Sequence, residues 1–500
     1  MGGERGFPSA ARHAQLRVRA TIEHGGSGMT FLRAAAAATT LFAALPADAQ
    51  QATALRPDQA RFLELYKELV ETNTVVNEGS CTKAAEQIAA RMKAAGFKDE
   101  QLTLFSTPEH PKDGGLVAVY PGTSKKAKPI LLLAHIDVVA AKREDWTRDP
   151  FKLVEESGYY YARGAVDDKA MAASWADTLI RFQQAGYKPK RTVKLALTCG
   201  EETTWAFNGA EWLAKNKRDL IDAEFALNEG GGGKSDGKGK VLVQQMQVGE
   251  KAVQNYRLET TNPGGHSSIP VPDNAIYQLA DALVRIRAYD FPLELSDTTR
   301  AYFAKAGAAR SDAMGKAMAA IAANPADKAA ESLLNTDRIF HSMLRTTCVA
   351  TLLEGGHANN ALPQRAAANI NCRIFPGHSS EETLKALTTA IGDAKVSITM
   401  VPPVRPIAKP PALDPKVVGP AEKLVAKYFP GVPLVPTMST GATDAIFLAA
   451  VGIPTYGVPG GWGDPDGNGV HGLNERVEIR SLYTGRDYLY DLVKAYAEQE

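Results

Sequence analysis

The spacing of apolar residues predicts alternating strands and helices along most of the chain. Residues 129–135 and 192–200 are nearly continuous apolar runs, which are typical of strands buried on both faces of a sheet. Between them, residues 169–185 favour a helix that ends at Gly186, and residues 223–231 supply another short strand. This order predicts an α/β fold around a mainly parallel sheet.

The pattern changes near residue 248. Residues 249–404 predict a strand, a helix, a helical insertion rich in Ala and Lys, two strands separated by a turn, a further helix and a last strand. This order suits a small α+β domain inserted into the α/β domain. The earlier alternation of strands and helices resumes over residues 405–500. We therefore expect a discontinuous catalytic domain made of residues 50–248 and 405–500.

Residues 1–49 predict a signal peptide region. After Met29 comes a short apolar stretch over residues 34–45, followed by small residues that end at Ala49, which is typical of a cleaved secretory signal. We expect a periplasmic or secreted protein, cleaved near Ala49, with Met29 as the true start. A disordered basic extension over residues 1–28 remains the alternative. No segment reaches the roughly 18 apolar residues of a membrane helix.

The composition narrows the class of protein. Hydrophobic residues make up 44% of the 500 residues, enough for two or three packed domains. Lys and Arg total 57 against 56 Asp and Glu, and no long basic run is present, so nucleic acid is not an expected partner. Export would place the four cysteines in an oxidising compartment, where disulfides can form. Their spacing leaves the pairing open.

Two of the buried strands are followed directly by candidate catalytic residues, at the edge where parallel sheets place reactive groups. His135 and Asp137 close the first strand two residues apart, so the imidazole can bind a metal while the carboxylate orients a neighbour. Glu201 and Glu202 follow the second strand, and adjacent carboxylates repel each other unless a cation lies nearby. This acid pair therefore favours a metal site.

Further candidates lie in three loops. Asp167 and Asp168 precede a predicted helix, where capping of the helix is the alternative to a metal-binding role. Glu229 precedes a run of four glycines that allows close approach of the backbone, and His471 lies in a glycine-flanked loop. A single histidine is weak evidence, but these residues together indicate one polar site.

The charges of this set favour two zinc ions. Asp167, Glu202 and Glu229 bring three negative charges, which together with a hydroxide balance two Zn²⁺, and His135 and His471 add neutral nitrogen ligands. Two metals about 3.5 to 4 Å apart can share a carboxylate and lower the pKa of a water between them. Glu201 is then free to take a proton from that water and pass it to a leaving nitrogen.

The motifs AHIDVV, ARGAVDDK, GEE, NEGG, GGHSSIP and VHGLNE occur in this order between residues 134 and 475. Together they resemble the two-zinc hydrolases of metallopeptidase clan MH, which include aminoacylase, carboxypeptidase G, yeast carboxypeptidase S and succinyl-diaminopimelate desuccinylase. The resemblance implies a zinc-exopeptidase-like catalytic domain and a lid domain that dimerises. It also implies one zinc on His135, Asp167 and Glu229, and a second on Asp167, Glu202 and His471, with Co²⁺ or Mn²⁺ as other possible metals.

The same resemblance implies roles for other residues. Glu201 would be the general base, and Asp137 would support His135. From the lid, His266 would stabilise the oxyanion in the partner subunit's active site, while Asn360 and Arg373 would grip the substrate. The segment STGATDA, residues 439–445, resembles a substrate-facing segment of the catalytic domain. Three alternatives remain open: a surface ion pair for Arg373, Asn359 in place of Asn360, and an ordinary turn for residues 439–445. Ala170 departs from the glycine that many relatives carry there.

The predicted activity is hydrolysis of an amide bond next to a free carboxylate, by a carboxypeptidase or an N-acyl-amino-acid amidohydrolase. The expected substrate is a small peptide or an N-acyl amino acid, and the expected assembly is a homodimer. An aminopeptidase or dipeptidase on the same metals is the alternative. A non-catalytic binding protein is disfavoured because all five expected ligands and Glu201 are present.

Overall fold

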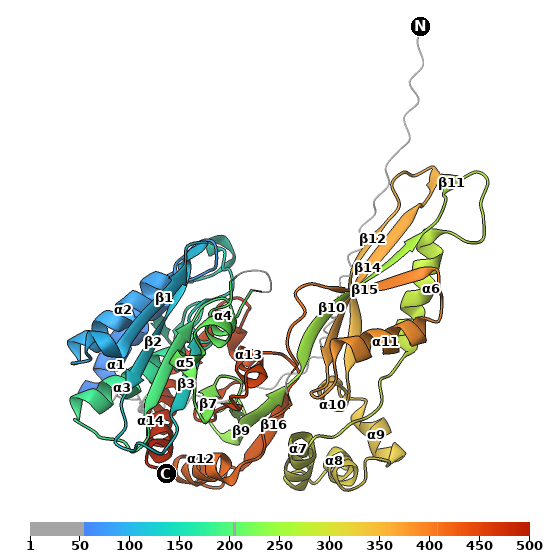
Figure 1. Cartoon of the computed structure of the whole chain (residues 1–500). Coiled ribbons are helices and arrows are strands. Elements are labelled where there is room, and N and C mark those ends of the chain that lie inside the picture. Colours follow the sequence, from blue (N-terminus) through green and yellow to red (C-terminus); the bar gives the residue numbers. More distant parts are fainter. Residues whose placement is uncertain (1–54, 204–206, 408) are drawn as a thin grey trace, which may run out of the picture. The chain divides into compact units, whose positions relative to one another are not determined.

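The computed structural model describes residues 55–203, 207–407 and 409–500 (Figure 1). The predicted signal peptide region, residues 1–49, lies outside the described residues. Within the described ranges, no helix is both long and apolar enough to cross a membrane.

A ten-stranded sheet forms the centre of the larger part of the chain. Its strands are β1 (Leu102–Thr107), β2 (His110–Tyr120), β3 (Ile130–His135), β6 (Val193–Thr198), β7 (Phe225–Asn228), β8 (Gly232–Ser235), β9 (Val241–Glu250), β16 (Leu434–Ser439), β17 (Thr455–Gly457) and β18 (Trp462–Gly463). The order is β1-β2-β6-β3-β7-β17-β9-β8-β18, with β16 paired to β9. The central strands β6, β3, β7 and β17 are parallel, which confirms the predicted mainly parallel α/β fold. The antiparallel strands β1 and β2 at one edge were not part of the sequence prediction.

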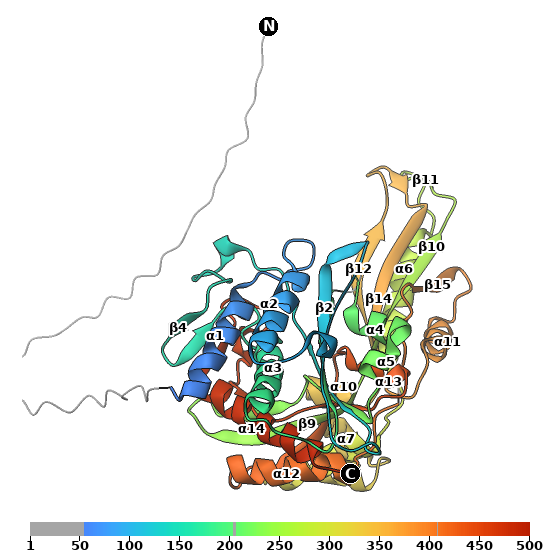
Figure 2. The same ribbon diagram turned by 60° about the vertical axis from the view of Figure 1, so that its left-hand side comes forward.

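Helices cover both faces of this sheet (Figures 1 and 2). One face packs against α1 (Pro57–Glu71), α2 (Cys81–Ala94), α3 (Lys169–Gln184), α12 (Pro415–Tyr428) and α14 (Ile479–Ala497). The other face packs against α4 (Gly209–Asn216), α5 (Arg218–Ile221) and α13 (Ala445–Ala450). Because both faces are covered, strands β3 and β6 are buried along their whole length, as their continuous apolar sequence predicts.

Residues 249–404, the predicted inserted domain, contain a second, antiparallel sheet of order β12-β14-β10-β15. Its strands are β10 (Ala252–Thr261), β12 (Thr347–Gly355), β14 (Arg365–Ile374) and β15 (Val396–Val401), and it packs against α6 (Ala275–Ala288) and α11 (Ser380–Ile391). A separate apolar core joins α7 (Asp297–Ala308), α8 (Ala313–Ala323), α9 (Lys328–Leu334) and α10 (Arg338–Met343). The boundaries of this domain stay a prediction.

All four cysteines form disulfides, which answers the question that their spacing left open. Cys81, the first residue of α2, pairs with Cys199, which follows β6. Cys348 pairs with Cys372, its direct neighbour across strands β12 and β14. The first disulfide therefore ties α2 to the segment that leads into Glu201 and Glu202.

Candidate active site

The register of two parallel strands brings the first candidate residues together. Strand β3 pairs with β6 so that His135 lies opposite Thr198, and the loops that follow both strands leave the sheet at the same edge. Asp137 is fully buried there. Its carboxylate oxygens accept hydrogen bonds from the backbone N–H groups of Glu201 (3.3 Å) and Glu202 (3.1 Å). Asp137 thus fixes the loop that carries the acid pair.

His135 belongs to a first group of possible metal ligands, together with Asp167 and Glu229. Its Nε2 lies 3.1 Å from Oδ1 of Asp167 and 3.8 Å from Oε1 of Glu229. Its Nδ1 lies 3.1 Å from the carbonyl oxygen of Asp137 and 3.5 Å from Oδ1 of the same residue. Nδ1 therefore has a hydrogen-bond partner, and Nε2 is the nitrogen that faces the two acidic side chains.

His471 belongs to a second group, together with Asp167 and Glu202. Its Nε2 lies 3.0 Å from Oδ2 of Asp167 and 2.9 Å from Oε2 of Glu202. His471 has a φ of 57°, a left-handed conformation that few residues other than glycine adopt. The loop between β18 and β19 (Arg476–Glu478) thus turns sharply at the point where His471 meets the two acids.

Asp167 is shared by both groups, with one carboxylate oxygen directed at each histidine. Hydrogen bonds with Asp167 and Glu202 raise the pKa of His471 to about 10. Burial lowers the pKa of His135, but Glu229, Asp137 and Asp167 outweigh this effect and hold it well above its usual range. The acidic side chains of the site thus favour positive charge, which divalent cations can supply.

These donors fit a pair of divalent metals. In each group, one ligand atom from every residue lies within 4.8 Å of the others, and the donors are one imidazole nitrogen and two carboxylate oxygens. Mixed nitrogen and oxygen donors suit zinc and its neighbours in the first transition series. A third group of possible ligands in the described residues, Cys81, Asp137 and Cys199, is no metal site because its two cysteines form a disulfide.

Glu201 and Asp168 lie beside the two ligand groups without belonging to either. Burial raises the pKa of Glu201 well above its usual value. Asp168 occupies the N-cap position of α3, yet its side chain accepts no capping hydrogen bond. The structure therefore does not show helix capping by the Asp168 side chain, which was the alternative to a metal-binding role for Asp167 and Asp168.

The three predicted lid residues lie on the sheets of residues 249–404. His266 in β11 (Gly265–His266) and Asn360, just before β13 (Ala361–Leu362), are brought together because these short strands pair. Arg373 lies on β14, and burial lowers the pKa of its guanidinium. Among the described residues, no carboxylate lies within ion-pair distance of Arg373, so the surface ion pair considered from the sequence is absent. None of the three forms an ion pair or hydrogen bond with a metal-ligand candidate in the described ranges.

Glu475 is a site residue that the sequence analysis did not assign. It is fully buried, and its Oε1 accepts hydrogen bonds from the backbone N–H groups of Val166 (2.8 Å) and Asp167 (3.1 Å). Its Oε2 accepts from the N–H of Gly164 (2.9 Å) and from Nη1 of Arg163 (2.7 Å). The motifs ARGAVDDK and VHGLNE, which are far apart in the sequence, are therefore joined by one carboxylate that holds the loop of Asp167.

Asp444 is a second such residue. Its buried carboxylate accepts hydrogen bonds from Nδ2 of Asn208 (2.6 Å) and from the hydroxyl of Thr198 (3.1 Å), the last residue of β6. The segment STGATDA, which the resemblance suggested as a substrate-facing loop, thus also anchors the chain near the acid pair. The sequence offered one signal for Glu475 and Asp444, namely that both lie within segments already identified. That position does not reveal which groups their carboxylates contact.

Comparison with known proteins identifies relatives along most of the chain. The chain is 27% identical over 394 residues to human "N-fatty-acyl-amino acid synthase/hydrolase PM20D1", with 76% of each protein covered. It is also 27% identical over 394 residues to "Probable carboxypeptidase S-like 2" of Dictyostelium discoideum, covering 76% of this chain and 74% of the relative. The predicted class, a carboxypeptidase or N-acyl-amino-acid amidohydrolase, agrees with these relatives.

Solved structures share the fold. An M20 family metallo-carboxypeptidase from Sulfolobus solfataricus superimposes with a TM-score of 0.65 at 20% identity, over 89% of this chain and all of the other. A dinuclear metal-binding peptidase of family M20 from Bacillus subtilis does so with a TM-score of 0.55 at 13% identity, over 87% of this chain and 98% of the other. The model of peptidase family M20/M25/M40 matches residues 131–495. The chain therefore belongs to this family of metallohydrolases, as its motifs predicted.

Proposed function

We propose that this protein is a two-metal hydrolase that cleaves an amide bond next to a free carboxylate, as a carboxypeptidase or an N-acyl-amino-acid amidohydrolase. The observation that carries the proposal is the pair of ligand groups that share Asp167, with Glu201 beside them. The names of the relatives, which include a carboxypeptidase and an N-acyl-amino-acid hydrolase, support the substrate class.

One metal would be held by His135, Asp167 and Glu229, and the other by Asp167, Glu202 and His471. We propose zinc, for which the mixed donors are suited, with Co²⁺ or Mn²⁺ as substitutes. When bound, such a pair lowers the pKa of a shared water and polarises the substrate carbonyl.

The chain's own groups would supply proton transfer and orientation. Glu201, which lies outside both ligand groups, would accept a proton from the attacking water and donate it to the leaving nitrogen. Asp137 would keep His135 oriented through Nδ1 and would hold the backbone of the acid pair through the contacts described above. His266 would donate a hydrogen bond to the oxygen of the tetrahedral intermediate, in the active site of a partner subunit.

The substrate carboxylate would be bound by Arg373 and Asn360. A guanidinium forms two parallel hydrogen bonds with a carboxylate, and Arg373 has no acidic partner of its own in the described part of the chain. A substrate amine, as in an aminopeptidase, would need an acidic partner. Apart from the proposed base Glu201 and from Asp168, whose Oδ2 is buried without a hydrogen-bond partner, the carboxylates of the described site are ligand candidates or are engaged in the contacts given above.

The proposal is tested with pairs of substrates that differ only at the carboxylate. We expect hydrolysis of N-acyl amino acids, and a fall in kcat/KM of about 100-fold or more when the carboxylate is amidated, because two charged hydrogen bonds are lost. Arg373→Ala should raise KM for the acids and leave the amides unchanged. Arg365→Ala, on the same strand but paired with Glu259, is the matched control. Efficient hydrolysis of aminoacyl anilides, unaffected by Arg373→Ala, would show that an amine is recognised instead.

We also propose a homodimer formed through the inserted domain. Strand β12 is an edge strand, and Val349, Leu352 and Leu353 on it are 59%, 67% and 71% exposed. Mixing the inactive variants His266→Ala and Glu201→Gln should restore part of the activity if His266 acts in the partner's site. A monomer at assay concentration whose mixture stays inactive would exclude this arrangement.

Export after cleavage near Ala49 is the remaining proposal. Pairing of all four cysteines supports it, since disulfides persist in oxidising compartments. N-terminal sequencing of the protein recovered from the periplasm or medium should begin near Gln50. Recovery of only uncleaved protein in the cytoplasm would contradict export.

A further inference from the structure

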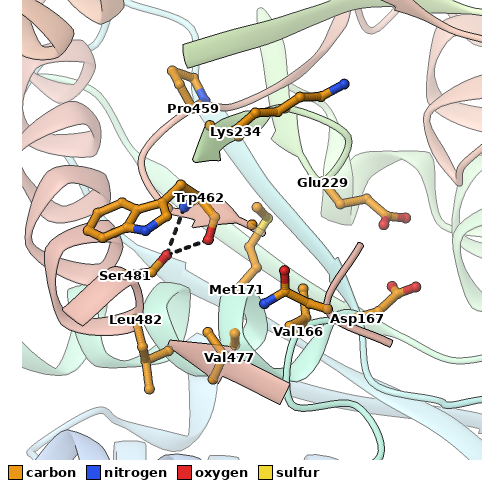
Figure 3. A pocket seen from close by; sticks show the side chains of 18 of the residues that line it. Val166, Asp167, Met171, Glu229, Lys234, Pro459, Trp462, Val477, Ser481 and Leu482 are labelled. Carbon is orange, nitrogen blue, oxygen red and sulfur yellow. Dashed lines mark hydrogen bonds between the residues drawn. The ribbon is translucent and has the colours of Figure 1, made fainter. Parts of the chain in front are cut away.

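Glu229, a proposed metal ligand, lies at a place where one side of the backbone has little packing. It follows β7 directly and is itself followed by the glycine run of residues 230–233. Together with Asp167 it lines a cavity of about 790 Å³, and Figure 3 shows the two carboxylates on the same side of that cavity. An added Cβ at Gly232 would meet no atom closer than 3.9 Å, so this glycine borders open space. The contacts that fix Glu229 therefore have to come from its other flank.

Two side chains contact the residues on either side of Glu229. Before it, Nδ2 of Asn228 donates a hydrogen bond to the hydroxyl of Thr443 (3.2 Å), and Asn228 is only 2% exposed. After it, Gly230 has a φ of 97° and packs so closely on Gln247 that an added Cβ would lie 2.3 Å from Oε1 of that side chain. Thr443 and Gln247 thus bracket the ligand.

Both bracketing side chains meet at one atom, Oε2 of Glu250. This oxygen accepts hydrogen bonds from the hydroxyl of Thr443 (2.8 Å) and from Nε2 of Gln247 (2.9 Å). Glu250 is the last residue of β9, and it belongs to no group of possible metal ligands among the described residues. The chemistry proposed above does not use it.

The carboxyl group of Glu250 occupies a position that is unfavourable for an acid. Burial raises its pKa to about 8, and a polar group taken out of water costs free energy unless new hydrogen bonds replace those to solvent. Within the described ranges Oε1 has no hydrogen-bond partner, so the replacement is incomplete. An apolar side chain of similar size would avoid this cost. What the carboxyl group supplies is the pair of contacts at Oε2.

We propose that Glu250 is a positioning residue for the ligand Glu229. It acts through Thr443 and Gln247, which it holds against the residues that flank Glu229. The inference rests on the proposed function, because Glu229 matters as a ligand only if the site binds metals. It makes the metal held by Glu229 depend on Glu250 and leaves the metal held by His471 unaffected.

Metal titration of two Glu250 variants is the first test. Glu250→Leu removes the acceptor at similar size, whereas Glu250→Gln keeps an acceptor oxygen. Starting from chelated protein, we expect Glu250→Leu to weaken one of two binding steps by about 10–100-fold, as for other residues that orient ligands, and Glu250→Gln to recover most of this loss. The weakened step should be the one that remains in His471→Ala, which lacks a ligand of the other group. Equal weakening of both steps, or equal behaviour of the leucine and glutamine variants, would overturn the proposal.

A second pair of variants tests the same contacts if Glu250→Leu does not fold. Thr443→Val replaces the hydroxyl by a methyl group of similar size, and Thr443→Ser keeps the hydroxyl. Valine should weaken the same binding step by about 10-fold or more, and serine should not. Thr260→Val is the matched control in the inserted domain, because it removes a fully buried hydroxyl that donates to the carbonyl oxygen of Ala275 (2.7 Å). A loss in Thr443→Ser or in the control as large as that in Thr443→Val would contradict the proposal.

Hydrogen exchange of the metal-free protein separates this inference from the proposed function. Residues 226–233 should exchange about 3–10-fold faster in Thr443→Val than in Thr443→Ser or the wild type, because a hydrogen bond that holds this segment is lost. If the wild type binds no metal and the exchange still differs in this way, the proposed function is refuted and the hold on the segment stands. If the wild type binds two metals, and neither metal affinity nor exchange changes in Thr443→Val and Glu250→Leu, the positioning role alone is refuted.

Discussion

Replacing Glu475 by glutamine should loosen the loop that carries the shared ligand Asp167. The carboxylate accepts four hydrogen bonds at 2.7–3.1 Å, one from the buried Arg163 and three from backbone N–H groups. In glutamine, an NH₂ group that donates hydrogen bonds replaces one of the two acceptor oxygens. This NH₂ group would face two of the four hydrogen-bond donors, and Arg163 would lose its negatively charged partner. Breaking a buried ion pair of this kind costs about 3–5 kcal/mol.

Urea unfolding of the metal-free protein measures this loss, and a competition titration measures metal affinity. We expect Glu475→Gln to lower the free energy of unfolding by about 3–5 kcal/mol and the metal affinity by about 10–100-fold, as for other residues that orient ligands. Glu156→Gln removes an ion pair with Arg148 whose glutamate is 51% exposed, and should cost less than about 1 kcal/mol. If Glu475→Gln behaves like this control in both assays, Glu475 does not hold the loop of Asp167.

Three further outcomes follow from the structure. Glu201→Gln should keep both metals and lose turnover by about 10²–10⁴-fold, and near-normal rates would place the general base elsewhere. Burial raises the pKa of Glu250 to about 8 from 4.5, so the folded state keeps a proton that the unfolded state releases, and stability falls as the pH rises from about 4.5 to about 8. Glu250→Gln should flatten this fall in a series of melting temperatures between about pH 5 and 8, and an unchanged slope would assign it to other groups. Removing the disulfide with Cys81→Ser and Cys199→Ser should cost about 2–5 kcal/mol in denaturant unfolding, and a stability equal to wild type would show that it adds nothing.

Much of the fold is readable from the sequence because burial on both faces leaves a simple pattern. Strands β3 and β6 are continuous apolar runs, and α3 ends close to Gly186, which has the positive φ that its position predicted. The hairpin β1–β2 escaped prediction, because β1 at the sheet edge has only one buried residue and β2 begins with a polar, partly exposed segment. Such a pattern does not distinguish an edge strand from a loop.

The candidate ligands could be found because only a few residue types bind metals, and here they follow strands or lie in short loop motifs. His135, Asp167, Glu202, Glu229 and His471 were all named from motifs, and the structure brings them together in two groups. Their supporting contacts could not be found in the same way. Glu475 and Asp444 act through distant partners such as the backbone of residues 164–167, and only the folded chain shows which residues these are.

A cavity of about 790 Å³ beside Asp167 and Glu229 was also beyond prediction from the sequence. Its walls are drawn from loops, strands and helices between residues 166 and 489, and each wall residue alone resembles an ordinary core residue. The glycine run after Glu229 was recognised as a place of close backbone approach, yet its pattern does not reveal that Gly232 borders open space. Empty volume depends on the fit between elements, which no local pattern records.

The central claim, a site for two metals that share Asp167, is tested most directly by elemental analysis of the purified, active enzyme. The account predicts two divalent metals per chain in the wild type, with activity lost on chelation and regained when both metals are restored. Active protein that contains no metal, or full activity with a single metal per chain, would contradict it.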